Sequence, residues 1–195
     1  TLVWLNAGSR ITYSQGFGVG NRKIELIGEG YFEVKRNEEV PFLVKTNSLL
    51  VKVLGTKFNF RDYPDDAEAI VSLSEGKVAL NNLLKKEKEA FLLPNERVVL
   101  KKKNGRMHVE YSTVSNALQW TNGYLFFDEE LLPDVVKELE RSYNVKIQIA
   151  SDTLNTFRFY GNFVHREQNI QEVLEALSAT RKIHYIIEGH NITLY

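Results

Sequence analysis

A pattern of apolar residues recurs three times in the first half of the chain, and it restricts this half to β-structure. The pattern begins at Val51, Val53, Phe58 and Phe60, returns twenty positions later at Val71, Leu73, Val78 and Leu80, and returns again at Phe91, Leu93, Val98 and Leu100. Each copy contains two pairs of alternating apolar residues, which is typical of two short β-strands. Between the two pairs the apolar positions change from odd to even numbers, so the buried face of the chain changes there.

A residue that tolerates positive φ lies near the centre of each copy, at Gly55, Gly76 or Asn95. We interpret these positions as corners at which the chain bends, so that both strands of a copy face one core. Stacked copies would form a solenoid-like or rolled-sheet lobe. A plain antiparallel sandwich with hairpins of similar length would give the same spacing. Both interpretations predict an all-β domain over residues 1–112, in which residues 28–30 (Gly-Glu-Gly) mark a further turn or bulge.

The period of the apolar pattern changes near Thr113 and then indicates helices. An amphipathic i, i+3, i+4, i+7 spacing occurs at Leu132, Val135, Val136 and Leu139, and it recurs 38 positions later at Ile170, Val173, Leu174 and Leu177. Alternating apolar residues typical of strands follow each set, and matching apolar pairs at residues 125–126 and 163–164 precede them. We therefore predict a second domain over residues 113–195, a small lobe of two βαβ repeats with helices near residues 130–142 and 168–180. A last strand is expected at residues 192–194.

Charge and cysteine content exclude several classes of function. The chain has 25 basic and 25 acidic residues and no net charge, whereas nucleic-acid binding requires a strong positive field. We interpret the densest basic run, residues 101–103, as a solvated hairpin tip. The chain has no cysteine and therefore neither a disulfide framework nor a thiolate site. No stretch approaches the ~18 consecutive apolar residues of a membrane span.

The residues that commonly carry catalysis or bind metals do not form a recognised motif. No pair of the four histidines has the spacing of a two-histidine metal motif: His108, His165, His184 and His190. Three clustered carboxylates could bind calcium, but a polar turn beside Pro64 explains them better: Asp62, Asp65 and Asp66. The glycine-rich residues 16–20 precede a predicted strand instead of the helix that a phosphate-binding loop requires. We predict that the chain is not an enzyme and needs no metal or cofactor.

Two alternatives stay open at the level of sequence, a carbohydrate-binding β module and a glycan-active enzyme whose catalytic pair is assembled by the fold. A sugar-binding module requires exposed aromatic platforms. The following tyrosines are not assigned to the predicted core: Tyr13, Tyr31, Tyr63, Tyr111 and Tyr160. A coplanar, exposed pair among these rings would favour sugar binding, whereas scattered, half-buried rings would favour a signalling protein.

Several longer motifs give the chain a family resemblance. "VWLNAGSRITY" (3–13), "IELIGEGYFEVKR" (24–36), "PFLVKT" (41–46) and "VLGTKFNFRDY" (53–63) resemble the periplasmic region of FecR-like regulators of extracytoplasmic sigma factors. "GYLFFDEELLPDVVKELERSYNVKI" (123–147) and "FRFYGNF" (157–163) are similar to the C-terminal domain that follows in the Bacteroidetes branch of that family. The resemblance covers nearly the whole chain.

The resemblance implies a periplasmic, signal-receiving region of an anti-sigma protein. Its expected partner is the signalling domain of a TonB-dependent outer-membrane receptor, and the second lobe is expected to resemble the secretin/TonB short N-terminal fold of that domain. In this family, a cytoplasmic segment that contacts the sigma factor and an inner-membrane anchor lie outside the region that this chain matches. We therefore expect no direct membrane contact by these residues.

The last predicted strand is our candidate partner-binding site. It follows a Gly-His-Asn turn and contains no proline or lysine that would block a sheet edge. Strand addition by the receptor domain would use backbone hydrogen bonds for affinity and alternate side chains for selectivity. The residues predicted to bind the partner are Ile192, Thr193, Leu194 and Tyr195. The alternative is that this strand lies inside the sheet or is covered by the first lobe, and the sequence leaves both open.

Overall fold

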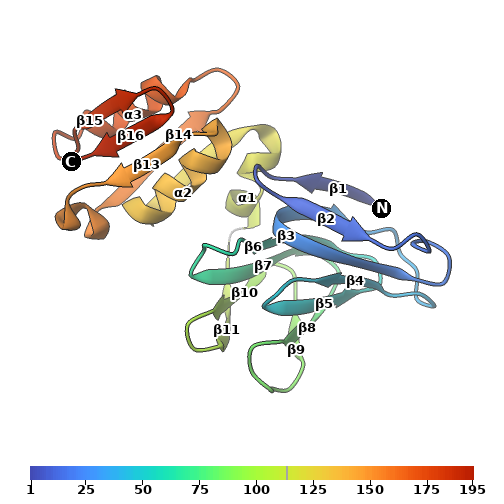
Figure 1. Ribbon diagram of the computed structural model, residues 1–195. Helices are drawn as coiled ribbons and strands as arrows, with labels where there is room; N and C mark the ends of the chain where they lie inside the picture. The colour runs from blue at the N-terminus through green and yellow to red at the C-terminus, as the bar shows by residue number, and fades with distance from the viewer. Residues whose placement is uncertain (113) are drawn as a thin grey trace. The chain divides into compact units, whose positions relative to one another are not determined.

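The computed structural model describes residues 1–112 and 114–195, which form two compact units, Thr1–Thr121 and Asn122–Tyr195 (Figure 1). The domain boundary predicted between residues 112 and 113 falls at Thr113, which lies outside the described residues. The structure places the division between the compact units a few residues later, at Thr121–Asn122.

The first unit is β-rich, as the alternating apolar residues predict. Its strands are β1 (Leu2–Leu5), β2 (Arg10–Tyr13), β3 (Arg22–Glu33), β4 (Phe42–Lys45), β5 (Leu49–Val53), β6 (Lys57–Asp62), β7 (Glu68–Glu75), β8 (Val78–Asn82), β9 (Ala90–Leu92), β10 (Glu96–Lys101) and β11 (Arg106–Tyr111). The short helix α1 (Val114–Ala117) and the 3-10 helix η1 (Gln119–Asn122) follow them.

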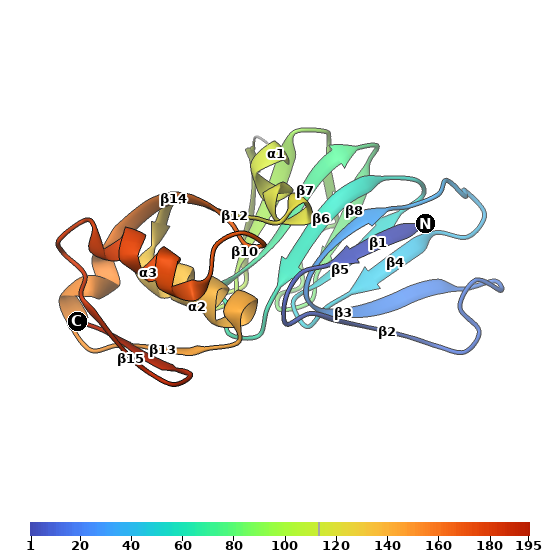
Figure 2. The same ribbon diagram turned by 90° about the horizontal axis from the view of Figure 1, so that it is seen from above.

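The described strands of this unit form one eleven-stranded sheet that rolls over on itself (Figure 2). The strand order is β11-β10-β7-β6-β3-β4-β5-β8-β9, and both β1 and β2 also pair with β3. Strand β3 joins the two halves because residues 28–33 pair with β6 and residues 22–25 pair with β4. Gly28 has a φ of 100° between these parts, so the predicted turn or bulge is a bend within one long strand. Apolar side chains from both halves meet in one core.

The three predicted corners lie where the chain passes from one half of the rolled sheet to the other. They connect β5 with β6, β7 with β8, and β9 with β10, which explains why the buried face changes at each corner. Positive φ is confirmed at Gly76 (93°) and Asn95 (66°). Gly55 serves close packing instead, because a Cβ there would lie 2.6 Å from the Cα of Arg36.

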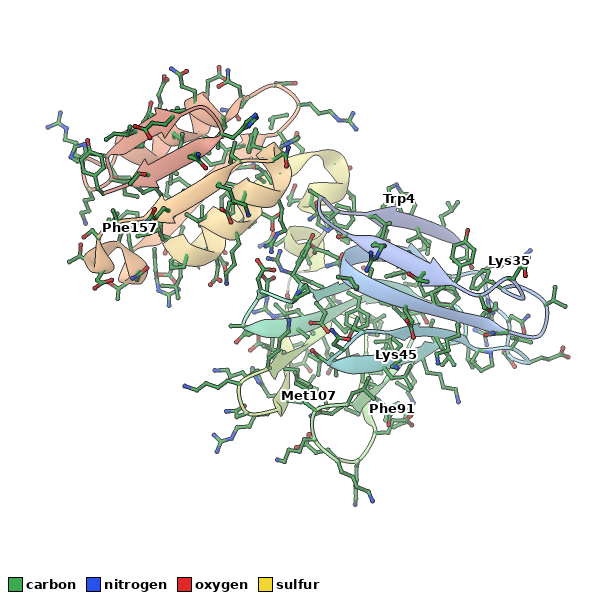
Figure 3. All side chains as sticks on the ribbon, viewed as in Figure 1. Trp4, Lys35, Lys45, Phe91, Met107 and Phe157 are labelled. Carbon is green, nitrogen blue, oxygen red and sulfur yellow. The ribbon has the colours of Figure 1, made fainter. Side chains whose placement is uncertain are left out.

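The solenoid-like alternative is wrong, because neighbouring copies of the repeat run antiparallel. Strands β5, β8 and β9 pair antiparallel in one half of the sheet, and β6, β7 and β10 do so in the other. The burial predicted for the third copy is also partly wrong. Phe91 and Leu93 are exposed and Leu92 is buried, since the short edge strand β9 has the opposite phase. Figure 3 labels Phe91 on this strand. The Phe91 ring lies instead against the Nζ of Lys77, 4.5 Å from its centroid.

The second unit contains strands and helices in the predicted order. Its elements are β12 (Tyr124–Leu131), α2 (Leu132–Tyr143), β13 (Lys146–Ile149), the 3-10 helix η2 (Asp152–Thr156), β14 (Arg158–Val164), α3 (Ile170–Ser178), β15 (Tyr185–Glu188) and β16 (Asn191–Leu194). Both predicted helices are found, and seven of the eight residues predicted for their apolar faces are buried, Ile170 being half-buried. A capping box between Asn169 and Glu172 fixes the start of α3.

The sheet arrangement of this unit differs from the predicted βαβ repeats. Strands β12 and β14 form an antiparallel pair, while β13, β16 and β15 form a separate three-stranded sheet. The two strands that flank each helix therefore belong to different sheets, whereas a βαβ unit places them parallel in one sheet. Figure 2 shows both helices between the two sheets, and the apolar side chains of all three layers form one core.

Candidate partner-binding interface

The predicted binding strand β16 is not an edge strand. It lies in the middle of the three-stranded sheet, parallel to β13 on one side and antiparallel to β15 on the other. Its side chains Ile192 and Leu194 are buried in the core. The partner-binding prediction for Ile192, Thr193, Leu194 and Tyr195 therefore loses the open edge on which it rested.

The open edge of this sheet belongs to β15. The backbones of His184 and Tyr195 exchange two hydrogen bonds of 2.9 and 3.0 Å, so the next directly bonded pair along the antiparallel ladder is Ile186 and Thr193. The intervening residues Tyr185 and Ile187 therefore direct their backbone N–H and C=O groups away from β16. Within the described residues, no further strand pairs with this side of β15.

The opposite edge of the same sheet is covered. The backbone N–H of Ile147 in β13 donates a 2.8 Å hydrogen bond to the Oε1 of Glu140, which lies on helix α2. A carboxylate in this position occupies a donor that an added strand would need.

Strand β15 contains neither proline nor lysine, and both of its isoleucines, Ile186 (50%) and Ile187 (40%), are exposed.

The two-stranded sheet of the second unit has a less suitable edge. Its register shifts between Phe127 and Glu130, where Glu129 adopts a φ of 58°. A bulge of this kind twists an edge strand away from further pairing, and Asp128 and Glu129 add negative charge beside it. Strand β15 is therefore the edge of this unit that best fits an incoming strand.

A network of polar side chains, centred on the buried Glu29, lies on the face of the rolled sheet that points away from the hydrophobic core. The carboxylate of Glu29 accepts hydrogen bonds from the side chains of Asn6 (2.9 Å) and Asn59 (2.8 Å), and it forms an ion pair with Arg61 (3.4 Å). The indole N–H of Trp120 donates to Asn59 Oδ1 at 3.3 Å, so η1 packs on this surface. Tyr31 lies two residues after Glu29 on β3. Its pKa is raised, mainly because the side chain is buried and secondly because the Glu33 carboxylate is close to it.

The predicted carboxylate cluster is divided among separate ion pairs. Asp62 binds the Nζ of Lys102 at 2.7 Å, and Asp66 binds the Nε of Arg61 at 2.9 Å. Among residues 1–112 and 114–195, no group of three or more histidine, aspartate or glutamate side chains could hold a metal ion. A cleft of about 260 Å³ lies beside the Asp62–Lys102 pair, and both charges are already satisfied by each other.

Comparison with known proteins matches both units to one family. The family model described as FecR protein matches residues 1–79, and the model described as FecR, C-terminal, matches residues 124–194. Two crystal structures of a candidate anti-sigma factor from Parabacteroides distasonis ATCC 8503, at 1.65 and 2.50 Å resolution, are each 33% identical in sequence. Their TM-scores are 0.88 and 0.87, with 99% of this chain and 89% and 88% of those chains covered. The chain belongs to the FecR family.

The remaining comparisons add little to FecR membership. The comparison with curated proteins gives no match. No helix in the described part of the chain is long and apolar enough to cross a membrane.

Among the described residues of this FecR protein, the five tyrosines considered for sugar binding do not include a coplanar, exposed pair. Tyr31 and Tyr63 are buried, and Tyr13, Tyr111 and Tyr160 are exposed on three different strands, β2, β11 and β14. In the part of the chain that the structure describes, the stacked ring pairs are core residues: Phe32 with Phe58, and Phe159 with Phe163.

Sequence reasoning missed the open edge of FecR strand β15. The alternation of Tyr185 and Ile187 identified a strand correctly, although Ile187 is exposed and not buried. The order of strands in the sheet is set by pairing between distant residues, and the alternation of apolar residues carries no signal for it.

Proposed function

We propose that this FecR protein is the periplasmic, signal-receiving region of a sigma-factor regulator. In this role the second unit binds the signalling domain of a TonB-dependent outer-membrane receptor. The signal passes to the sigma factor through a membrane anchor and a cytoplasmic segment outside residues 1–195. The role requires binding and no catalysis.

Family membership of both units is the observation that carries this proposal. The two FecR models together span most of the chain, and the solved relatives of the same architecture are candidate anti-sigma factors. The open edge of β15 supplies a surface of the required kind, because unpaired backbone groups beside exposed Ile186 and Ile187 accept an extended strand of a partner.

The test is a calorimetric titration of residues 1–195 with the isolated signalling domain of the cognate receptor. The substitution Ile187→Pro removes an N–H that faces the open edge and leaves the pairing with β16 intact. Loss of one interfacial hydrogen bond and its neighbouring contacts should raise Kd by about tenfold. Ile186→Thr, which removes an exposed apolar side chain from the same strand, should weaken binding as well.

Phe126→Thr is the matched control, because Phe126 is also exposed but lies on the other sheet of the unit. Its Kd should equal that of the unchanged protein. Equal binding by all variants would show that the receptor docks elsewhere than β15. No binding by the unchanged protein would contradict the receptor as the partner.

A further inference from the structure

Two hairpin tips that are separate in sequence lie side by side on the first unit. One tip connects β8 with β9 (residues 83–89), and the other connects β10 with β11 (residues 102–105). The side-chain Nδ2 of Asn82 donates a 2.8 Å hydrogen bond to the carbonyl of Gly105. Gly105 has a φ of 65°, and a Cβ there would lie 3.3 Å from the Cβ of Lys85. We call the combined surface, residues 83–89 and 101–106, the basic tip.

Positive charge is concentrated in the basic tip although the whole chain is neutral. The tip contains seven basic and two acidic residues. Two of the cations are neutralised, because Lys85 pairs with Glu87 at 3.0 Å and Lys102 pairs with Asp62 at 2.7 Å. The other five are exposed and form no ion pair within the described residues: Lys86, Lys88, Lys101, Lys103 and Arg106.

Two exposed leucines accompany these charges. Leu83 (43%) and Leu84 (45%) lie at the start of the first tip, directly before its lysines. A soluble polyanion is bound by cations alone and makes no use of exposed leucine side chains. The interface of an anionic bilayer uses both groups, since lysines reach the headgroup phosphates while apolar side chains enter the boundary with the acyl chains.

We propose that the basic tip docks on the surface of an anionic phospholipid bilayer. The five unpaired cations lie among the headgroup phosphates, and Leu83 and Leu84 enter the interfacial region. The expectation of no membrane contact rested on the absence of a membrane span from this region. The absence of a membrane span does not exclude a membrane-binding surface that forms only when two hairpins are brought together. This proposal does not depend on the receptor as partner.

Co-sedimentation of residues 1–195 with lipid vesicles tests the proposal. The protein should bind vesicles of phosphatidylglycerol and phosphatidylcholine in equal amounts, bind pure phosphatidylcholine weakly, and dissociate from the anionic vesicles as salt is raised. The double substitution Lys86→Gln with Lys103→Gln should lower partitioning roughly thirtyfold, because each lysine near an anionic surface strengthens binding about fivefold. Leu83→Ser with Leu84→Ser should also lower partitioning, without any change in charge.

The matched control removes the same charge elsewhere. Lys23 and Lys52 are exposed on strands β3 and β5 and form no ion pair within the described residues, so Lys23→Gln with Lys52→Gln should leave partitioning nearly unchanged. Circular dichroism verifies that each variant is folded.

Three results would overturn membrane docking by the basic tip. The first is absence of binding to the anionic vesicles. The second is a control pair that weakens binding as much as the tip lysines do. The third is a leucine pair without effect, together with full competition by inositol hexakisphosphate, which would assign the tip to a soluble polyanion.

Discussion

At the scale of single residues, a buried acid is held by several polar partners. Glu29 is 4% exposed, yet it lies on the outer surface of the rolled sheet and is paired with Arg61 on β6. The cost of burying this carboxylate is offset because Asn6, Asn59 and Arg61 all donate to it. The network fixes the start of the chain and η1 against the same surface, through Asn6 and Trp120.

Removal of this acid should leave the buried Asn59 amide without this acceptor and should remove one partner each from Asn6 and Arg61. Glu29→Ala is expected to lower the free energy of unfolding by about 3 kcal/mol, as for other buried ion pairs that lose one member. Urea unfolding followed by circular dichroism measures the loss. Glu33→Ala, on the same strand but half-buried, should cost less than about 1 kcal/mol. Equal losses at both positions would contradict the role assigned to the network.

At the scale of secondary-structure elements, β16 holds the three-stranded sheet together. Residues 191, 193 and 195 bond to β15, while the carbonyls of His190 and Leu194 accept from Lys146 and Ala150 on the β13 side. A strand that is hydrogen-bonded to a neighbour on each side cannot pair with an additional strand. The outer strand β15 is therefore the place where this sheet can be extended.

Substitution of the central strand should damage the fold before it affects binding. Thr193→Pro removes the N–H that faces Ile186 and leaves its acceptor unpaired, so the second unit should lose roughly 1–3 kcal/mol of stability. Thermal unfolding measures this loss. In contrast, Ile187→Pro on the open side of β15 should shift the unfolding temperature little. A destabilised Ile187→Pro and an unaffected Thr193→Pro would reverse the assignment of edge and centre.

At the scale of the whole molecule, each compact unit has its own core. One cluster of buried side chains belongs to the rolled sheet, and a second contains the side chains of α2, α3 and both sheets of the second unit. Independent cores are the physical requirement for independent folding. We propose that the two units are separate domains, as the change of apolar period near Thr113 predicts.

Expression of residues 122–195 alone tests this division. The fragment should fold and unfold in one cooperative transition, with the stability of about 3–5 kcal/mol that a core of this size supplies. Urea denaturation followed by circular dichroism measures it. The fragment should also bind the receptor signalling domain with the affinity of residues 1–195. A fragment that shows no cooperative transition would contradict its status as a domain.

The sequence by itself determined the elements and the family of this protein. Alternation and helical spacing are set by residues a few positions apart, so the strands, the corners at Gly76 and Asn95, and helices α2 and α3 could be predicted. Longer motifs were sufficient to indicate FecR membership.

Only the tertiary structure decided which surfaces are available to partners. The central place of β16, the hydrogen bond from Trp120 to Asn59, and the contact between the tips at Lys85 and Gly105 all join residues far apart in the chain. The apolar pattern states which side of a strand is buried, but it leaves open which strand lies beside it. That choice depends on the packing of the complete core, and it placed both candidate surfaces, the β15 edge and the basic tip.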